Sequence, residues 1–272
     1  MKKKLLSTTS LTLEPFERFD LLPLSFSRIN KFITDRTGFY ISYIHGFKGS
    51  SCSMERGTWA EHGVLKLFEG MSEEDAIKDA LYYFDKSVDE KNLQDDPKRK
   101  LERDNLPKYI KGFWKELKNF ILKDFQEKQE SKILGIDLIG YTDFGLIIPQ
   151  SPPDQPEEIY FKVDCKSSGR MPSKLSNSIG LQQTYYTSTS NVENKVLYSV
   201  VSGGQTKTKW FNLENTHTYE KVFRDMIISM HSFLSKCEDK EEMKKLIVPD
   251  LDLWIWNYDP KITEVRKEIW GY

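Results

Sequence analysis

The sequence predicts an α/β protein in which a mixed central β-sheet is flanked by helices, with a helical elaboration on the N-terminal side. Helical apolar repeats dominate the chain up to residue 125, an alternation typical of strands follows, and one more helical repeat comes after the strands. With 272 residues, 38% of them hydrophobic, the chain is long enough for a sizeable core. We therefore expect a single domain over 1–272, with an irregular segment at 1–23, a helical insertion at 72–128, a sheet core at 133–213, and a helix and tail at 218–272.

Two helices are expected before residue 70. Ser25 or Ser27 can cap a short helix that carries apolar residues at helical spacing. In the second helix, which we place at Arg56–Phe68, apolar side chains again recur at near-helical spacing. This second helix carries Glu61.

Two longer helices follow. Ser72 is the expected cap of a helix whose apolar stripe lies opposite four acidic residues. A charged linker, residues 91–100, is expected to be mobile and leads to a long amphipathic helix over Leu106–Phe125.

Strand patterns begin after residue 132. Ile133–Ile148 reads as two strands or one bent hairpin, and the proline-rich residues 149–158 form a loop, because proline cannot sustain a central ladder. A strand begins at Ile159. The remaining expected elements are a helix at Leu175–Thr187, strands at Lys195–Ser202 and Lys207–Leu213, a helix at Tyr219–Lys236, and an edge strand within residues 250–259.

Composition excludes several classes of protein. Three cysteines are too few for a disulfide framework or a four-cysteine cluster, and the four histidines show no zinc-like spacing. There is no apolar run long enough for a signal peptide core or a membrane span, so we expect a cytoplasmic protein that does not act at a membrane. The net charge of −1 gives no global attraction to nucleic acid, but residues 159–210 carry five more positive than negative charges.

The strand that begins at Ile159 carries the most informative residues. Its apolar residues alternate with polar ones, which predicts a strand with one buried face and places Asp164 and Lys166 together on the wet face. An acid two positions before a lysine recurs in this chain, but elsewhere in charged helices or loops. On an apolar strand, such a carboxylate can hold a divalent cation while the ammonium orients water or steadies charge on a phosphate.

A second acid is expected beside this strand. Asp143 follows Gly140, and 21 positions separate it from Asp164, enough for a strand, a loop and a returning strand. Asp137 is a rival for the same role. We prefer Asp143 because the glycine three residues earlier permits close backbone approach.

Four short motifs, in this order, resemble the PD-(D/E)XK nuclease superfamily, in particular RecB-like and phage-type exonucleases. The motifs are RGTWAEHG, GYTDF, VDCKSSGRMP and GLQQTYY. The expected order of helices and strands around them extends the resemblance to roughly residues 24–234. The resemblance implies a restriction-endonuclease-like core and a Mg²⁺-dependent deoxyribonuclease, with Mn²⁺ as a substitute and an exonuclease favoured over an endonuclease. It also implies a role in DNA recombination, repair or degradation. A phage-encoded origin would place the protein in the host cytoplasm. Its expected partners are further copies of the same chain in a homo-oligomer, or a single-strand-annealing or other recombination protein.

By position in the motifs, the resemblance assigns roles to individual residues. Glu61, Asp143, Asp164 and the backbone carbonyl of Cys165 would be metal ligands, Lys166 would activate or position the attacking water, and Gln182 with Tyr186 would complete the fourth motif. His62 is an alternative to Glu61, and Gln183 is an alternative phase to Gln182. Thr142 stands where the superfamily often has a proline.

The substrate would be DNA. Arg170 and Lys174 follow the acid-bearing strand and are placed for phosphate contacts, and Ser167 can donate a hydrogen bond to the nucleic-acid backbone. Two other functions remain open: a catalytically inactive nucleic-acid-binding relative of the same fold, and a metal-dependent phosphatase-like enzyme.

Overall fold

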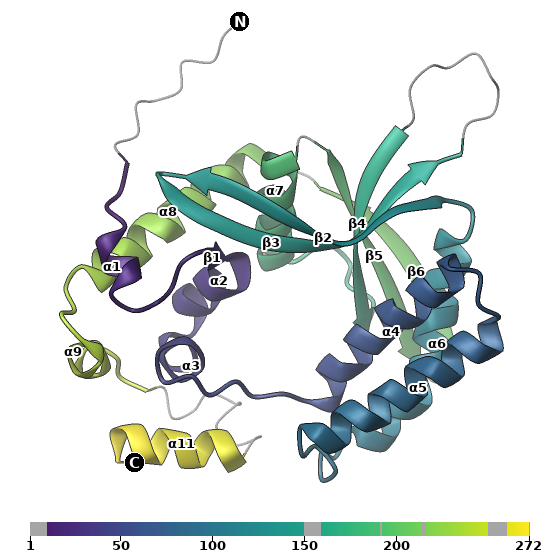
Figure 1. Ribbon diagram of the computed structural model, residues 1–272, viewed down its shortest axis with the longest axis horizontal. Helices are drawn as coiled ribbons and strands as arrows, with labels where there is room; N and C mark the ends of the chain where they lie inside the picture. Colours follow the sequence, from purple (N-terminus) through teal and green to yellow (C-terminus); the bar gives the residue numbers. More distant parts are fainter. Residues whose placement is uncertain (1–9, 150–158, 191, 214–215, 250–259, 272) are drawn as a thin grey trace, which may run out of the picture. The chain divides into compact units, whose positions relative to one another are not determined.

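Six strands form one mixed sheet with helices on both faces, which confirms the expected fold class and is compatible with a restriction-endonuclease-like core (Figure 1). The computed structural model describes residues 10–149, 159–190, 192–213, 216–249 and 260–271. By contacts, these residues divide into two compact units, one of residues 1–49, 130–140 and 217–272, the other of residues 50–129 and 141–216. This division does not test the prediction of a single nuclease domain over 1–272.

The first unit is mainly helical. In α2 the hydroxyl of Ser25, rather than Ser27, accepts a hydrogen bond from the Arg28 N–H at 3.3 Å and caps the helix. A short helix within the segment expected to be irregular shows that this prediction was wrong for residues 14–17. Besides the strand ends at 130–140, the described elements of this unit are α1 (Glu14–Glu17), β1 (Leu24–Ser25), α2 (Phe26–Thr34), α3 (Arg36–Phe39), the π-helix η1 (Tyr40–Ile44), α8 (Thr216–Leu234), α9 (Lys240–Lys245) and α11 (Pro260–Trp270).

Three packed helices open the second unit: α4 (Cys52–Phe68), α5 (Glu73–Glu90) and α6 (Arg99–Leu117). Ser51 and Ser72 cap α4 and α5 by accepting from backbone N–H groups in the first turn, so the prediction for Ser72 is confirmed. The linker at 91–100 is pinned, because the Asp96 carboxylate accepts hydrogen bonds from the N–H groups of Cys52 and Lys98 at 2.8 Å.

The boundary after α6 differs from the prediction. α6 begins at Arg99 and ends at Leu117, and β2 (Ile121–Ile133) occupies what was expected to be the end of a helix and of a helical insertion. β3 (Ile136–Ile148) is one strand, not two, and pairs with β2 through a turn of two residues. Leu134 and Gly135 have φ values of +55° and +82°, as a tight hairpin turn requires.

The sheet order is β1-β3-β4-β5-β6, with β2 on β3 as well. β4 (Ile159–Ser168) runs antiparallel to β3 and parallel to β5 (Glu193–Ser202), and β6 (Gln205–Asn212) closes the far edge antiparallel to β5. The predicted strands at Ile159, Lys195 and Lys207 are thereby confirmed, as is the helix α7 (Asn177–Ser190). The expected proline loop at 149–158 lies outside the described residues except for residue 149. The expected tail strand at 250–259 lies wholly outside them.

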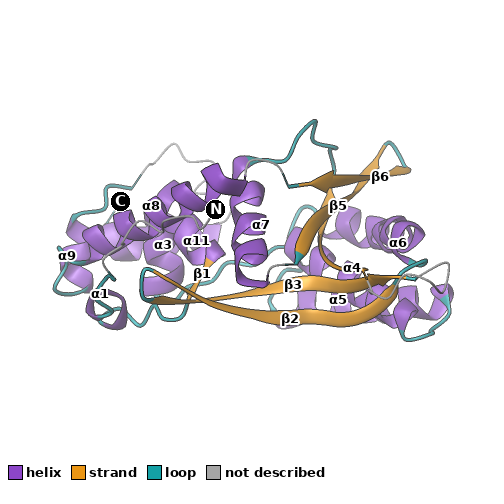
Figure 2. Cartoon of the chain, turned by 90° about the horizontal axis from the view of Figure 1, so that it is seen from above, coloured by secondary structure: helices purple, strands orange, loops and turns teal. Residues whose placement is uncertain are grey.

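The two faces of the β4–β5 pair are covered differently. α4, α5 and α6 bury one face around Val163, Cys165 and Leu197. The loop before α7 and the start of α7 cover Val196, Tyr198 and Val200 on the other, and Figure 2 shows α7 and α6 on opposite sides of β5. None of the described helices is long and apolar enough to span a membrane.

Candidate active site

β3 and β4 part at the position of two aspartates. Their ladder pairs Ile148 with Ile159 and runs to Phe144 and Val163, and it is not continued at the next pair, Asp143 and Asp164. There the Oδ2 atom of Asp143 accepts a hydrogen bond from the N–H of Cys165 at 2.7 Å. The Asp143 carboxylate thus accepts a hydrogen bond from a backbone N–H group beyond the end of the β3–β4 ladder. Asp143 and Asp164 lie on neighbouring strands.

Asp164 is not on a wet face, so this part of the prediction was wrong. The side chains from Phe161 to Cys165 are all buried, because the helical layers cover β4 on both faces. The Asp164 carboxylate is instead neutralised by the ammonium of Lys166, with Oδ2 2.6 Å from Nζ. A buried charge is tolerated when it is paired in this way.

Glu61 reaches the same place from α4. Burial raises the pKa of its carboxyl well above the usual value, and the negative charges of Asp143 and Asp164 raise it further. The pKa of Asp143 is raised to about 7, first by burial and then by Asp164. Such mutual effects require the three acids to lie close together, since Coulomb interactions fall off with distance.

The rival ligands are engaged elsewhere. His62 Nε2 lies 2.7 Å from Asp79 Oδ2 on α5, and its ring contacts Trp59 and Tyr83. Asp137 is half exposed and forms an ion pair with Lys132 at 3.0 Å. Neither side chain contributes to the group formed by Glu61, Asp143, Asp164 and Lys166, which we call the acid cluster.

The fourth motif borders the acid cluster. Gln182 Nε2 donates to the hydroxyl of Tyr186 at 3.1 Å, one helical turn later on α7. The pKa of Tyr186 is raised, first by burial and then by the charge of Asp164. The alternative residue, Gln183, is fully buried, and its amide has no hydrogen-bond partner among the described residues.

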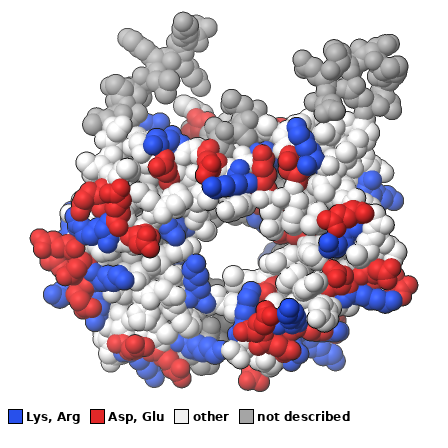
Figure 3. Space-filling model, viewed as in Figure 1, with Lys and Arg blue, Asp and Glu red and all other residues white. Residues whose placement is uncertain are grey.

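The basic residues divide into surface and interior groups. Arg170 and Lys174 are exposed in the loop between β4 and α7, and Lys209 reaches this loop by donating to the Ser173 carbonyl at 3.4 Å. Lys162 is instead buried and paired with Glu127 at 2.8 Å. Positive and negative side chains are interspersed on the face in Figure 3, in line with the net charge of −1.

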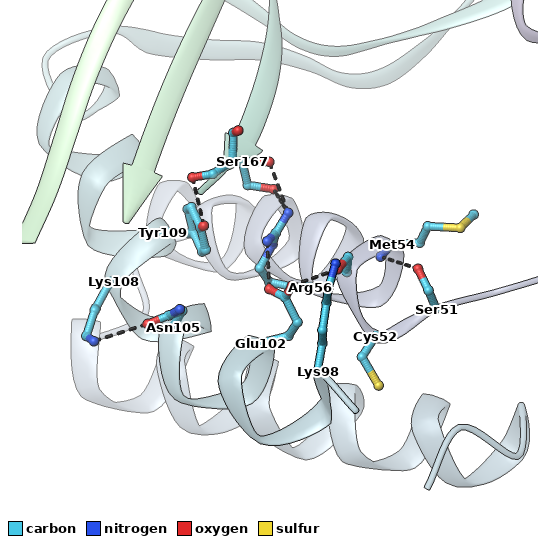
Figure 4. A network of polar contacts seen from close by, with 12 residues as sticks. Ser51, Cys52, Met54, Arg56, Lys98, Glu102, Asn105, Lys108, Tyr109 and Ser167 are labelled. Atoms are coloured by element: carbon cyan, nitrogen blue, oxygen red, sulfur yellow. Dashed lines mark hydrogen bonds and ion pairs between the residues drawn. The ribbon is translucent and has the colours of Figure 1, made fainter. Parts of the chain in front are cut away.

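A buried arginine that sequence reasoning missed ties α4 to β4 (Figure 4). Arg56 Nη1 lies 2.6 Å from Glu102 Oε2 on α6, and its Nη2 donates to the carbonyl and the hydroxyl of Ser167, each at 3.0 Å. The guanidinium lies over the ring of Tyr109, whose hydroxyl donates to the Ser168 carbonyl at 2.9 Å. Ser167, expected to contact DNA, therefore accepts a hydrogen bond from Arg56.

The donor set fits a hard divalent cation. Three carboxylates against one ammonium leave an excess of negative charge in a buried place, and carboxylate oxygens are ligands that Mg²⁺ prefers. No group of three or more His, Cys, Asp or Glu side chains in the described ranges forms a ready cage for a metal ion. Mg²⁺ in proteins is usually held by one or two carboxylates while it keeps waters and binds substrate phosphates.

Comparison with known proteins adds little beyond this geometry. No family model matches the chain, and no curated protein matches it. A solved structure from Eubacterium rectale, provisionally named an exonuclease, has 13% sequence identity and a TM-score of 0.47, with 91% of this chain and 89% of that one covered. The structure of a protein named SSO0001 has 11% identity and a TM-score of 0.32, with 75% and 85% covered. With similarity this low, the function must be argued from the acid cluster itself.

Proposed function

We propose that this protein is a metal-dependent DNA nuclease that hydrolyses phosphodiester bonds, with exonuclease action favoured. The observation that carries the proposal is the convergence of Glu61, Asp143, Asp164 and Lys166 from one helix and two strands that part at this point. Paired acids beside a lysine can together hold a divalent cation and steady the charge of a phosphate.

In this proposal the three acids hold Mg²⁺, or Mn²⁺ in its place, and the carbonyl of Cys165 adds a ligand. When bound, the cation polarises the scissile phosphate and lowers the pKa of water. The acids contribute by remaining fixed: the hydrogen bond from the Cys165 N–H holds one Asp143 oxygen, and α4 holds Glu61. Water would then attack phosphorus and lose a proton to solvent, the bond from phosphorus to one sugar oxygen would break, and that oxygen would take up a proton from solvent.

Lys166 acts as a cation in this scheme, not as a base. Burial lowers the pKa of its ammonium, but the charges of Asp164 and Asp143 outweigh burial and raise the pKa above its usual value. A lysine that keeps its proton cannot accept one from water. It can orient the attacking water and steady the negative charge of the phosphate.

Gln182 and Tyr186 would complete the site, and Ser167, Arg170 and Lys174 would contact the DNA backbone. Arg170 and Lys174 are exposed in one loop directly after β4, so a strand of DNA at the acid cluster could reach both. The protein would act in DNA recombination, repair or degradation in the cytoplasm, including the host cytoplasm for a phage-encoded enzyme. A second copy of the chain, or a single-strand-annealing or other recombination protein, would be its partner.

The test compares end-labelled linear duplex DNA with a covalently closed circle, each with Mg²⁺ and with chelator. We expect the linear DNA to be degraded from its ends with Mg²⁺ only, and the circle to survive. Cutting of the circle would reject an obligate exonuclease. Binding of DNA without cleavage of either substrate would instead favour the inactive relative.

A further inference from the structure

The edge strand β6 carries two lysines on the same face of the sheet as Lys166 of the acid cluster. Lys166 of β4 is paired with Tyr198 of β5, and Tyr198 is paired in turn with Lys209 of β6. Side chains of paired residues point to the same face, as do residues two positions apart on one strand. Lys207 and Lys209 therefore share the face of Lys166, which is the face covered by α7 and the loop before it.

The loop between β4 and α7 crosses β5 on this face and reaches β6. Met171 and Leu175 of the loop pack against three side chains of β5. Further along the same loop, the carbonyl oxygen of Ser173 accepts a hydrogen bond from Lys209 Nζ at 3.4 Å. The loop that starts beside the acid cluster is thus attached to the far edge of the sheet.

Positive charge follows this path without any negative charge in the same segments. Residues 165–177 and 198–212 contain no Asp or Glu. The carboxylate of Glu116 contacts β6 from α6, on the other face of the sheet, where it accepts hydrogen bonds from Thr208 and Trp210. Such a run creates a local positive potential in a protein whose net charge is −1. Its exposed members, which we call the basic strip, are Arg170, Lys174, Lys207 and Lys209.

The distribution of charge on β6 points to a ligand. Lysines on an edge strand also hinder pairing with another sheet, but this protection does not require them to lie on one face. The opposite face of β6 carries Thr206, Thr208 and Trp210 and no charge. Both lysines of the strand lie on the face of the acid cluster, as an anionic ligand that extends from the cluster requires.

We propose that Lys207 and Lys209 form a second phosphate-binding subsite, which holds the DNA backbone away from the scissile phosphate. This inference rests on the proposed function. Two strand spacings separate β4 from β6, so the backbones that carry Lys166 and Lys209 lie about 10 Å apart. The subsite would therefore contact phosphates further along the DNA than the one at the acid cluster. Contacts of ammonium groups to phosphates carry no base information, so the subsite would hold DNA of any sequence.

The test replaces both lysines by glutamine and measures the affinity for labelled duplex DNA by fluorescence anisotropy over a salt series. Chelator is present, so that binding is separated from metal-dependent cleavage. We expect weaker binding at every sequence and a slope of log affinity against log salt that is shallower by about 2, because each phosphate contact contributes roughly 0.9. Glutamine keeps a donor for the Ser173 carbonyl, and the unfolding midpoint checks that the variant is folded. Lys207→Gln alone should make the slope shallower by about 1.

Lys115→Gln with Lys118→Gln is the matched control. Both lysines are exposed at the end of α6, which lies on the opposite side of β5 from α7 (Figure 2). This double variant loses the same two charges and should keep the wild-type slope. A wild-type slope in the folded Lys207→Gln/Lys209→Gln protein, or equal changes in the two double variants, would overturn the inference.

Failure of the proposed function would look different. Binding with the expected change of slope, but no cleavage by the wild type with Mg²⁺, would support the subsite and reject the nuclease. Cleavage by the wild type with an unchanged slope in the β6 variant would reject the subsite alone. No binding of DNA by the wild type at any salt concentration would reject both.

Discussion

At the residue scale, Asp143 shows how the acid cluster lowers the folding stability of the metal-free protein. Its carboxyl is buried beside Asp164, and its pKa is raised to about 7. In the unfolded chain an aspartate has a pKa of about 3.9. Between these values the folded state holds more protons than the unfolded state, so folding stability falls as the pH rises.

Asp143→Asn should therefore stabilise the metal-free protein. The asparagine oxygen can still accept the hydrogen bond from the Cys165 N–H, while the buried charge is gone. In chelator, we expect the unfolding midpoint of the variant to exceed that of the wild type by a few degrees at pH 8. The gap should open as the pH rises from about 4 and level off above about 7, in line with the two pKa values.

Thermal unfolding at several pH values checks this prediction. A variant less stable than the wild type at pH 8 would show that the charge of Asp143 is well compensated in the metal-free fold. Mn²⁺ should raise the midpoint of the wild type and leave that of the variant nearly unchanged, because a ligand is lost.

The sequence could predict which residues meet at the acid cluster but not their surroundings. Motif order and strand alternation pointed to Asp143, Asp164 and Lys166, which the fold brings together. Burial of Asp164 could not be predicted, because alternation identifies one apolar face and does not reveal that α7 and the loop before it cover the other. The left-handed backbone of Gln126, with a φ of +48°, was also hidden, since nothing in QEKQ favours a left-handed residue.

At the scale of elements, α4 and β4 must keep a fixed relation, because one carries Glu61 and the other carries Asp164 and Lys166. Arg56 joins them with two hydrogen bonds to Ser167 and an ion pair to Glu102. The sequence held a sign of this role, because Arg56 lies in phase with Cys52 and Ala60 on the buried stripe of α4. A charged residue on such a stripe needs partners.

Arg56→Lys should reduce stability and cleavage together. A lysine keeps the charge but cannot make the forked contacts to Ser167 and Glu102, which leaves buried acceptors without donors. We expect a loss of about 2–4 kcal/mol in unfolding free energy by denaturant titration, because breaking a buried pair is costly. Cleavage should fall at temperatures where the variant is still folded.

Arg103→Lys is the control for this change. Arg103 lies on α6 and pairs with Asp85 of α5, but near the surface, where such pairs contribute about 1 kcal/mol or less. Equal losses in the two variants would contradict a special role for Arg56.

The boundary between α6 and β2 illustrates why element ends escape sequence analysis. Phe120, Ile121 and Phe125 continue the three- and four-residue spacing of α6, so the pattern favours one long helix. In the fold, Phe120, just before β2, packs against Phe161, and Phe125 of β2 packs against Phe144, so both rings are partly buried against the core. Tertiary contacts of this kind override local periodicity.

At the scale of the whole molecule, affinity for DNA must come from local charge, since the net charge is −1. Replacing Arg170 and Lys174 together by glutamine should weaken DNA binding at every sequence. The slope of log affinity against log salt should become shallower by about 2, because each phosphate contact contributes roughly 0.9 for duplex DNA. Fluorescence anisotropy over a salt series measures this slope.

Lys78 and Lys86 provide the matched pair for that experiment. Both are exposed on α5, where they pair with Glu74 and Glu90. Their double replacement by glutamine should leave the slope unchanged. If both double variants change the slope equally, the loop after β4 is not the DNA contact.

The central claim, that the acid cluster cuts DNA, is tested most directly by the cleavage rate of Asp164→Ala on end-labelled linear duplex with Mg²⁺. Asp137→Ala serves as the control, because Asp137 is half exposed, pairs with Lys132 and lies outside the cluster. Each protein is purified free of host nucleases and shown to be folded by circular dichroism. The account predicts no cleavage by Asp164→Ala and wild-type cleavage by Asp137→Ala; wild-type digestion by a folded Asp164→Ala protein would contradict it.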